Sequence, residues 1–325
     1  MIKISKKTLQ DLEYESVVEQ IAELNVTSLG KTKILNTVPF SNRNEVIRSL
    51  NLTNEFLTSF ENENRIPNHG FEDITKELKL IKIENNYLEI NGFRKIASCC
   101  ITSNILIKFF KKHKDYYPLL NTLSSTNDIN TIIPDAINDV IDKHGEIRNN
   151  ASDLLYTTRK SIQSIRTKVN SSFNSALSTY NSADYLDDIR ETVMENRRVL
   201  AVKSMHRRKI KGSILGSSKT GSIVYIEPET THQHQRELNN LEFEESEEIK
   251  RILLELTSLI SVYSNYLSKC QFYLTEIDVI YAKAKYAKSI QAVLPKITEI
   301  QEIYLVDAYH PLLLVSNRKE ETKTY

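Results

Sequence analysis

Apolar and polar positions divide the chain into two long segments of helical character around a short segment of strand character. Neither glycine nor proline occurs in residues 146–211 or in residues 229–294. Because these two residue types normally interrupt helices, their absence favours long helices. We therefore predict an ascending helix within residues 142–184 and a returning helix within residues 232–290.

In both segments the apolar residues recur at steps of three and four, which places them on one face of a helix. A helix from Asp142 to Tyr180 would be about 58 Å long, too long to be buried in a domain of this size. We expect the two helices to pair antiparallel along their apolar stripes and to form a projecting arm. The ascending stripe comprises Ile147, Ala151, Leu154, Leu155, Ile162, Ile165, Val169, Phe173, Ala176 and Leu177. The returning stripe comprises Leu238, Leu241, Ile249, Ile252, Leu253, Leu256, Leu259, Ile260, Tyr263, Leu267 and Phe272.

The segment between the helices, residues 185–231, has the pattern of a small sheet. Apolar and β-branched residues gather there in four short runs separated by polar breaks, which predicts two hairpins. Asn196-Arg197 supplies the first turn, and Gly221 can take the positive φ that the second turn needs. The predicted strands are residues 192–195, 198–203, 210–215 and 222–226.

Four motifs in and just after this segment carry a resemblance to a known family. They are R-V-L-A-V-K at 198–203, K-G-S-I at 211–214, T-G-S-I-V-Y-I-E-P at 220–228 and E-L-N-N at 237–240. Together they resemble the clamp region of the second bacterial branch of the MutS proteins, which lacks the mismatch-reading domain of MutS itself. Leu200-Ala201 replaces the family's Ile-Pro, and Tyr225 replaces its Phe. Both changes retain strand character.

Weaker motifs on either side follow in the family's order, so the resemblance covers nearly the whole chain. Before the clamp motifs come Leu12-Glu13-Tyr14, Gly30-Lys31, Pro39, Glu55 and residues 70–74; after them come Asp278, residues 281–287 and residues 303–313, where Tyr309 replaces an Arg. The resemblance implies a mainly α fold: a helical core domain with a long antiparallel lever arm that bears a small β-rich clamp at its tip. The implied parts are a core at 1–141, an ascending lever helix at 142–184, a clamp at 185–231, a returning lever helix at 232–290 and, at 291–325, a return to the core leading to an ATPase domain.

The resemblance also implies a function for the whole protein. The family binds double-stranded or branched DNA without sequence preference as an ATP-dependent homodimer in DNA repair or recombination control, or acts on colliding ribosomes. ATP and magnesium would belong to an ATPase domain that this chain does not include. We therefore expect this chain to be no enzyme, with no catalytic residue, cofactor or metal of its own.

Composition restricts the candidate chemistry. The chain carries 43 Lys and Arg and 42 Asp and Glu, a net charge of +1, so any nucleic-acid contact requires a local basic patch. Its three cysteines make neither a disulfide framework nor a CxxC metal pair. No apolar run approaches the roughly 20 residues of a spanning helix, and no signal core follows the N-terminal lysines. These observations favour a cytoplasmic setting without a membrane partner, and the resemblance implies that it is bacterial.

The main candidate site is a basic cluster in the predicted clamp. Exposed lysines and arginines can bind duplex phosphates without reading bases, which suits sequence-independent binding. Charge runs are more often plain solvated surface. A second hypothesis is a helical interaction scaffold, including one that acts in ribosome quality control, with no DNA contact. The candidate residues are Arg197, Arg198, Lys203, Arg207, Arg208, Lys209, Lys211 and Lys219.

Three other sequence patterns give weaker evidence for a functional site. The loop from Gly216 to Ser222 has two glycines but lacks the lysine of a phosphate-binding loop, so we expect an ordinary strand connection. His232 and His234 are too poorly spaced for a metal pair and are interpreted as surface residues near a helix start. The acidic run from Glu242 to Glu248 is interpreted as the solvated side of the returning helix.

Overall fold

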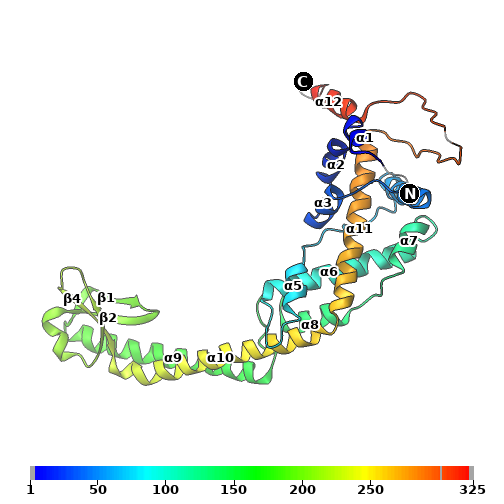
Figure 1. Ribbon diagram of the computed structural model, residues 1–325. Helices are drawn as coiled ribbons and strands as arrows, with labels where there is room; N and C mark the ends of the chain where they lie inside the picture. Colours follow the sequence, from blue (N-terminus) through cyan, green and yellow to red (C-terminus); the bar gives the residue numbers. More distant parts are fainter. Residues whose placement is uncertain (1–3, 301, 322–325) are drawn as a thin grey trace. The chain divides into compact units, whose positions relative to one another are not determined.

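The computed structural model describes residues 4–300 and 302–321, which fold into two contact units (Figure 1). Unit 1 combines the chain up to Asp139, residues 143–145 and the chain from Leu254 onward. Unit 2 combines Val140–Asp142 with Glu146–Leu253. Helices dominate both, and the described residues contain one four-stranded antiparallel sheet. The predicted mainly α class is confirmed.

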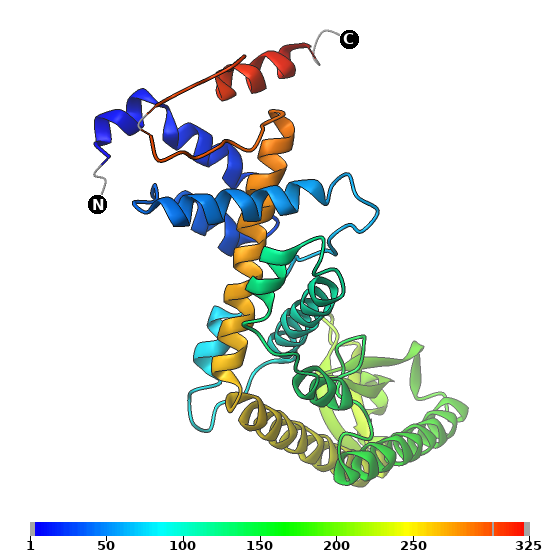
Figure 2. The ribbon, with the colours of Figure 1, turned by 90° about the vertical axis from the view of Figure 1, so that its right-hand side faces the viewer.

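Unit 1 is built around the long helix α11 (Ser264–Ser289), which packs against α2, α3, α4, α5 and α6 (Figure 2). Buried residues occur on several sides of α11, as expected for a helix surrounded by others. Ala282 and Ala284 are fully buried, and such small side chains let neighbouring helices approach closely. The other helices of this unit are α1 (Lys6–Asp11), α2 (Tyr14–Ala22), α3 (Ser28–Leu35), α4 (Arg43–Thr58), α5 (Thr75–Leu80), α6 (Ile90–Lys112), α7 (Pro118–Ser124), α8 (Ile132–Val140, whose last residue belongs to unit 2) and α12 (Pro311–Glu321).

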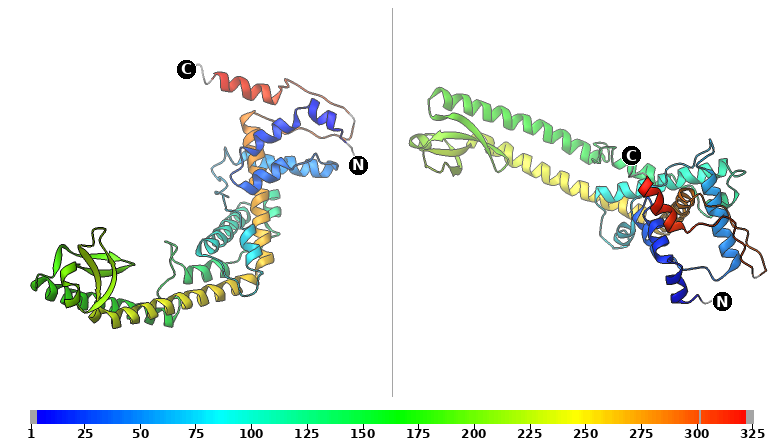
Figure 3. Two further views of the ribbon diagram at one scale, coloured as in Figure 1. Left: turned by 60° about the vertical axis from the view of Figure 1, so that its left-hand side comes forward. Right: turned by 90° about the horizontal axis from the view of Figure 1, so that it is seen from above.

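Unit 2 contains two long helices that lie side by side, α9 (Asp153–Ser182) and α10 (Glu229–Ser261, whose residues from Leu254 onward belong to unit 1) (Figure 3). Ile162 and Ile165 of α9 pack against Leu238 of α10, so the apolar stripes meet as predicted. Polar bonds fix the direction: Ser152, before α9, reaches Glu248, whereas Ser172, far along α9, reaches the Thr230 carbonyl near the start of α10. The pairing is therefore antiparallel.

Helix α9 starts later than predicted. The predicted start at Asp142 is wrong, because Ile141 and Ile147 form an isolated bridge around a turn in which Gly145 has φ +84°. The Ser152 hydroxyl then accepts the Leu155 N–H at 3.0 Å and caps the helix. The 30 residues of α9 span about 45 Å at about 1.5 Å per residue, shorter than the predicted 58 Å or so.

The returning segment is two helices and not one. Helix α10 ends at Ser261, and α11 begins at Ser264 after a tight turn in which the Tyr263 N–H donates to the Ile260 carbonyl. No glycine or proline marks this break. Ile260 and Leu267, on either side of the turn, are both fully buried. Burial in unit 1 thus redirects the chain where local sequence would continue a helix.

The sheet has strand order β1-β2-β4-β3 and is antiparallel throughout. Its strands are β1 (Leu186–Met194), β2 (Arg197–Lys203), β3 (Gly212–Ser217) and β4 (Ile223–Pro228). The two hairpins are confirmed, but the first turn falls at Glu195-Asn196, one residue earlier than predicted, with φ 48° and 61°. Two consecutive positive φ values match the twist of paired strands.

One face of the sheet packs on α9. Phe173 of α9 contacts a cluster that includes Leu200 and Val202 of β2 and Ile226 of β4. Some predicted stripe residues lie outside the packed surface: Leu154, Leu259 and Phe272 are exposed. Among the described residues, no helix combines the length and apolar character needed to cross a membrane.

Candidate nucleic-acid interface

Positive charge gathers in unit 2 between residue 204 and residue 221. This stretch contains five basic residues and no acidic one. The rest of the chain has 38 basic residues against 42 acidic ones, a net charge of −4. Positive charge is therefore concentrated in this stretch, which we call the basic turn.

The basic turn begins with a short 3-10 helix, η1 (Ser204–Lys209), between β2 and β3. Its conformation is fixed by packing. Ile210 is buried in the cluster beneath the sheet, and the His206 ring lies 4.9 Å from the Tyr185 ring between centroids. Lys209 Nζ lies 4.9 Å from the centroid of the same Tyr185 ring. The side chains of this turn are thus presented from a supported backbone.

Strand register places the second basic segment beside the first. Lys203 pairs with Ile223, and the Ser204 N–H donates to the Ser222 carbonyl at 2.9 Å. The turn that carries Lys219 therefore joins the sheet next to the start of η1. Gly221 in this turn has φ +70°, a conformation that favours glycine.

Three of the eight candidate cations are engaged within unit 2. Arg197 lies 3.1 Å from buried Glu227, and Lys203 lies 2.9 Å from Asp184. The hydrogen bond from Lys203 lowers the pKa of the Asp184 carboxyl. Arg198 lies 2.6 Å from Glu191 and 4.2 Å from the centroid of the Phe173 ring. These three cations are paired with acidic residues of unit 2, and Arg198 also contacts α9. We call them the bracing cations.

The other five cations face solvent. Arg207, Arg208, Lys211 and Lys219 are exposed, and the structure shows no ion pair for them within residues 4–300. Lys209 is also exposed and contacts only the Tyr185 ring. The structure thus separates the cluster predicted from sequence into a bracing group and an exposed group. DNA contact by these residues stays a prediction.

The glycine-containing loop from Gly216 to Ser222 connects β3 to β4, and a strand follows it. A Cβ at Gly216 would lie 2.8 Å from Met194 Cε, the end of a flexible side chain that can move aside. The predicted strand connection is confirmed. Of the two nearby histidines, His232 lies 3.9 Å from Glu227 at the start of α10. The described part of the chain contains no group of three residues arranged to hold a metal ion.

The interpretation of the acidic run as solvated surface is wrong for three of its members. Glu242, Glu245 and Glu248 accept from Arg166, Arg159 and Ser152, at 2.7, 2.6 and 2.6 Å. Glu248 is buried, and its hydrogen bonds from Arg251 and then Ser152 outweigh burial and lower its pKa to about 2. The three partners recur every seven residues and the glutamates every three, so spacing alone did not predict this pairing.

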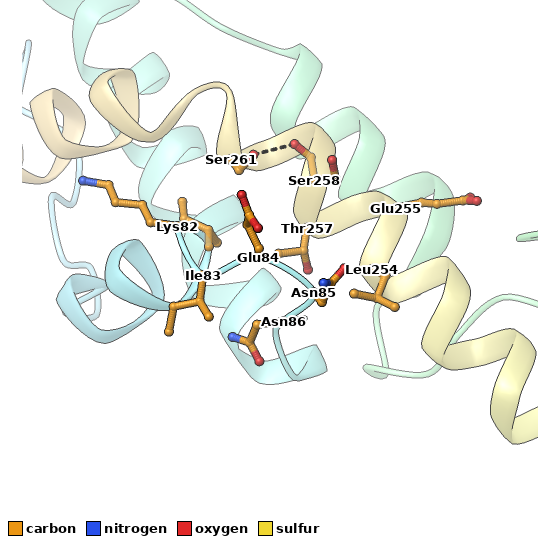
Figure 4. A pocket seen from close by; sticks show the side chains of 11 residues that line it. Lys82, Ile83, Glu84, Asn85, Asn86, Leu254, Glu255, Thr257, Ser258 and Ser261 are labelled. Atoms are coloured by element: carbon orange, nitrogen blue, oxygen red, sulfur yellow. Dashed lines mark hydrogen bonds between the residues drawn. The ribbon is translucent and has the colours of Figure 1, made fainter.

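A hollow of about 670 Å³ in unit 1 offers a weaker alternative site (Figure 4). It lies between the loop after α5 and the last turns of α10. Its charged lining consists of one lysine, Lys82, and two glutamates, Glu84 and Glu255. In Figure 4, Lys82 and Glu255 extend outward on opposite sides. A net negative lining does not suit a phosphate.

Several motif residues of unit 1 have structural roles. Buried Asp278 accepts the Val26 and Thr27 N–H groups at 2.9 and 3.0 Å and lies 3.0 Å from His69 Nε2. A Cβ at Gly30 would lie 2.1 Å from Asp278 Oδ2, so this position requires glycine. The Glu55 carboxylate accepts the Leu119 and Leu120 N–H groups at the start of α7, at 2.9 to 3.1 Å. None of these residues is left available for a ligand.

Comparison with known proteins now places the chain. No family model matches it. Proteins named "Endonuclease MutS2" from Geobacillus sp. (strain WCH70) and Alkaliphilus oremlandii (strain OhILAs) are 29% and 28% identical to 98% and 95% of the chain. A protein of the same name from Clostridium perfringens (strain SM101 / Type A) is 30% identical to 95% of it. The chain resembles the MutS2 proteins.

This similarity confirms the resemblance to the second MutS branch that the clamp motifs indicated. It extends over nearly all of the chain but over a minority of each relative. The chain spans 42% of the Geobacillus MutS2 protein and 39% of the other two. The activity, substrates and partners of a whole MutS2 protein can therefore only be proposed for this chain.

Proposed function

We propose that this chain is a DNA-binding portion of a MutS2-like protein and that the basic turn of unit 2 is its contact surface. The observation that carries the proposal is the group of five exposed cations without an acidic residue among them. Such a surface binds phosphates, and phosphate contacts carry no direct sequence information. The turn's support from Ile210 and Tyr185 holds the cations on a fixed scaffold.

In this proposal α9 and α10 form a lever and the sheet forms a clamp at its end. The chain contributes binding, and ATP hydrolysis belongs to another part of a MutS2-like protein that acts as a homodimer. The engaged cations, Arg197, Arg198 and Lys203, maintain the clamp, while the exposed five contact duplex or branched DNA. The competing hypothesis is a helical scaffold that docks a protein or ribosomal partner, and the experiment below separates the two.

The test measures the affinity of the full chain for a labelled duplex across a salt series. If about four side chains contact phosphates, the slope of log affinity against log salt is about −3.6, at about 0.9 per contact. Changing Arg207, Arg208 and Lys209 together to Ser should reduce the slope by up to about 2.7. Folding should be unaffected, because exposed charges contribute little to stability.

A matched control removes the same charge elsewhere. Lys108, Lys111 and Lys112 lie exposed on α6 in unit 1, and their joint replacement by Ser also removes three positive charges. The control variant should retain the parent's affinity and slope. If both triple variants bind as the parent does, the basic turn is solvated surface and the scaffold hypothesis is favoured.

A further inference from the structure

A second hollow in unit 1 has the properties of a binding site and is separate from the basic turn. Its volume is about 460 Å³, within the range of small-ligand pockets. It lies between the end of α4, the segment 65–69 and the last turns of α11. We call it the aromatic corner, lined by Phe56, Phe60, His69 and Tyr281 together with Arg65 and Lys288.

The rings of the aromatic corner are held in place. Phe60 and Tyr281 are half-buried, with centroids 6.0 Å apart and planes at 80°. Phe56 lies buried behind them, 5.6 Å from Tyr281. His69 lies 4.7 Å from Tyr281 and is fixed by buried Asp278. The half-buried rings therefore present apolar surface that is supported by buried side chains.

Positive charge surrounds these rings. Lys288 Nζ lies 5.3 Å from the Phe60 centroid, and Lys285 Nζ lies 5.4 Å from the Tyr281 centroid. The exposed Arg65 side chain lines the same hollow. Within the described ranges the structure shows no carboxylate paired with any of these three cations. Asp278, which contacts His69, is buried and is also engaged by Thr27.

We propose that the aromatic corner binds an unpaired nucleotide, with its base against Phe60 and Tyr281 and its phosphate at Arg65, Lys285 and Lys288. Aromatic rings combined with nearby cations are the two elements that bind single-stranded nucleic acid. A cationic ligand would suit the rings, but three cations repel it. The shared chemistry is a base with an attached phosphate, supplied by a single strand or by a free mononucleotide.

The experiment measures binding of the full chain to a fluorescein-labelled oligothymidylate of about 8 nucleotides by fluorescence anisotropy. Phe60→Leu keeps apolar volume but removes the ring, and should weaken binding about 5- to 100-fold, the loss of one base stack. Phe109→Leu, in another aromatic group of unit 1, is the matched control and should bind as the parent does. Joint replacement of Arg65 and Lys288 by Ser tests the phosphate contact without altering buried packing.

Two further measurements identify the ligand and distinguish this site from the proposed duplex-binding site at the basic turn. Competition by thymidine monophosphate at concentrations similar to those of the strand assigns the pocket to free nucleotides; competition only by the strand assigns it to single strands. Duplex affinity should respond to the basic-turn triple variant and not to Phe60→Leu. Parent-like binding of the oligothymidylate by both Phe60→Leu and the Arg65/Lys288 variant would overturn the proposal, whatever the duplex result.

Discussion

Asp278 in unit 1 and the basic turn in unit 2 show two opposite treatments of charge. The Asp278 carboxylate is buried, and backbone N–H groups, a hydroxyl and His69 surround it. The cations of the basic turn lie in solvent, and most have no partner among the described residues. The Asp278 carboxylate is fully engaged by groups of its own unit, whereas the cations of the basic turn are available to another molecule. The comparison teaches that a charged residue in a motif can serve the fold and not a ligand.

Removing the Asp278 carboxylate should have the largest effect. Asp278→Ala leaves the Val26 and Thr27 N–H groups and His69 without their acceptor inside unit 1. A buried donor left without its acceptor costs about 1–3 kcal/mol, and this substitution affects several such groups at once. Urea unfolding followed by circular dichroism measures this loss. Asp115→Ala, at an exposed position of the same unit, should change stability by less than about 0.5 kcal/mol.

Filling the space beside Asp278 should have a smaller effect. Gly30→Ala places a Cβ 2.1 Å from Asp278 Oδ2 and 2.6 Å from Asn25 Nδ2, so these groups must shift. Overpacking of this kind costs about 1–3 kcal/mol. Gly92→Ala on α6 meets its nearest atom, Glu77 Cγ, at 3.2 Å and should cost less in the same urea series. Equal losses for the two variants would contradict the close approach at Gly30.

Arg198 tests whether the bracing cations differ from the exposed ones. Arg198→Ala removes the contacts with Glu191 and the Phe173 ring and should lower stability by about 1 kcal/mol. Its salt slope for duplex binding should stay near that of the parent. Arg208→Ala should show the reverse, with unchanged stability and a slope smaller by about 0.9. If the two variants behave alike in both measurements, the division into two groups is wrong.

A pH-dependent effect concerns acid stability in unit 2. The pKa of Glu248 is lowered from 4.5 to about 2, first by its hydrogen bond with Arg251. A depressed carboxyl pKa contributes stability above the unfolded value, and this contribution is lost as pH falls through the folded value. The stability gap between the parent and Glu248→Gln should therefore close between about pH 4.5 and pH 2. Glu244→Gln, at an exposed position of the same helix, should show no such pH-dependent gap.

Residue spacing predicted much of unit 2. The Ile162, Ile165 and Leu238 seam follows from steps of three and four, because a helix brings such residues to one face. The two hairpins follow from apolar runs around turn residues. Spacing did not place the acids Glu242, Glu245 and Glu248 against α9, because the register between two helices depends on both partners at once.

The candidate site was predictable in part. Sequence identified the eight basic residues, since their density is visible along the chain. It did not separate the bracing cations from the exposed ones, because Arg197 contacts Glu227 and Arg198 contacts Glu191 only through strand pairing and turn geometry. The aromatic corner could not have been found from sequence, because Phe60 and Tyr281 are far apart in the chain and meet only where α4 packs on α11.

The sequence by itself determined the helical class, the two hairpins and the resemblance to MutS2, because periodicity and short motifs are local properties. Tertiary structure alone decided the break between α10 and α11 and the burial of Asp278. At Val262-Tyr263 no residue interrupts the helix locally, yet burial of Ile260 and Leu267 fixes a turn. The physical reason is that burying apolar groups and satisfying buried charges depends on partners distant in sequence, which no local pattern specifies.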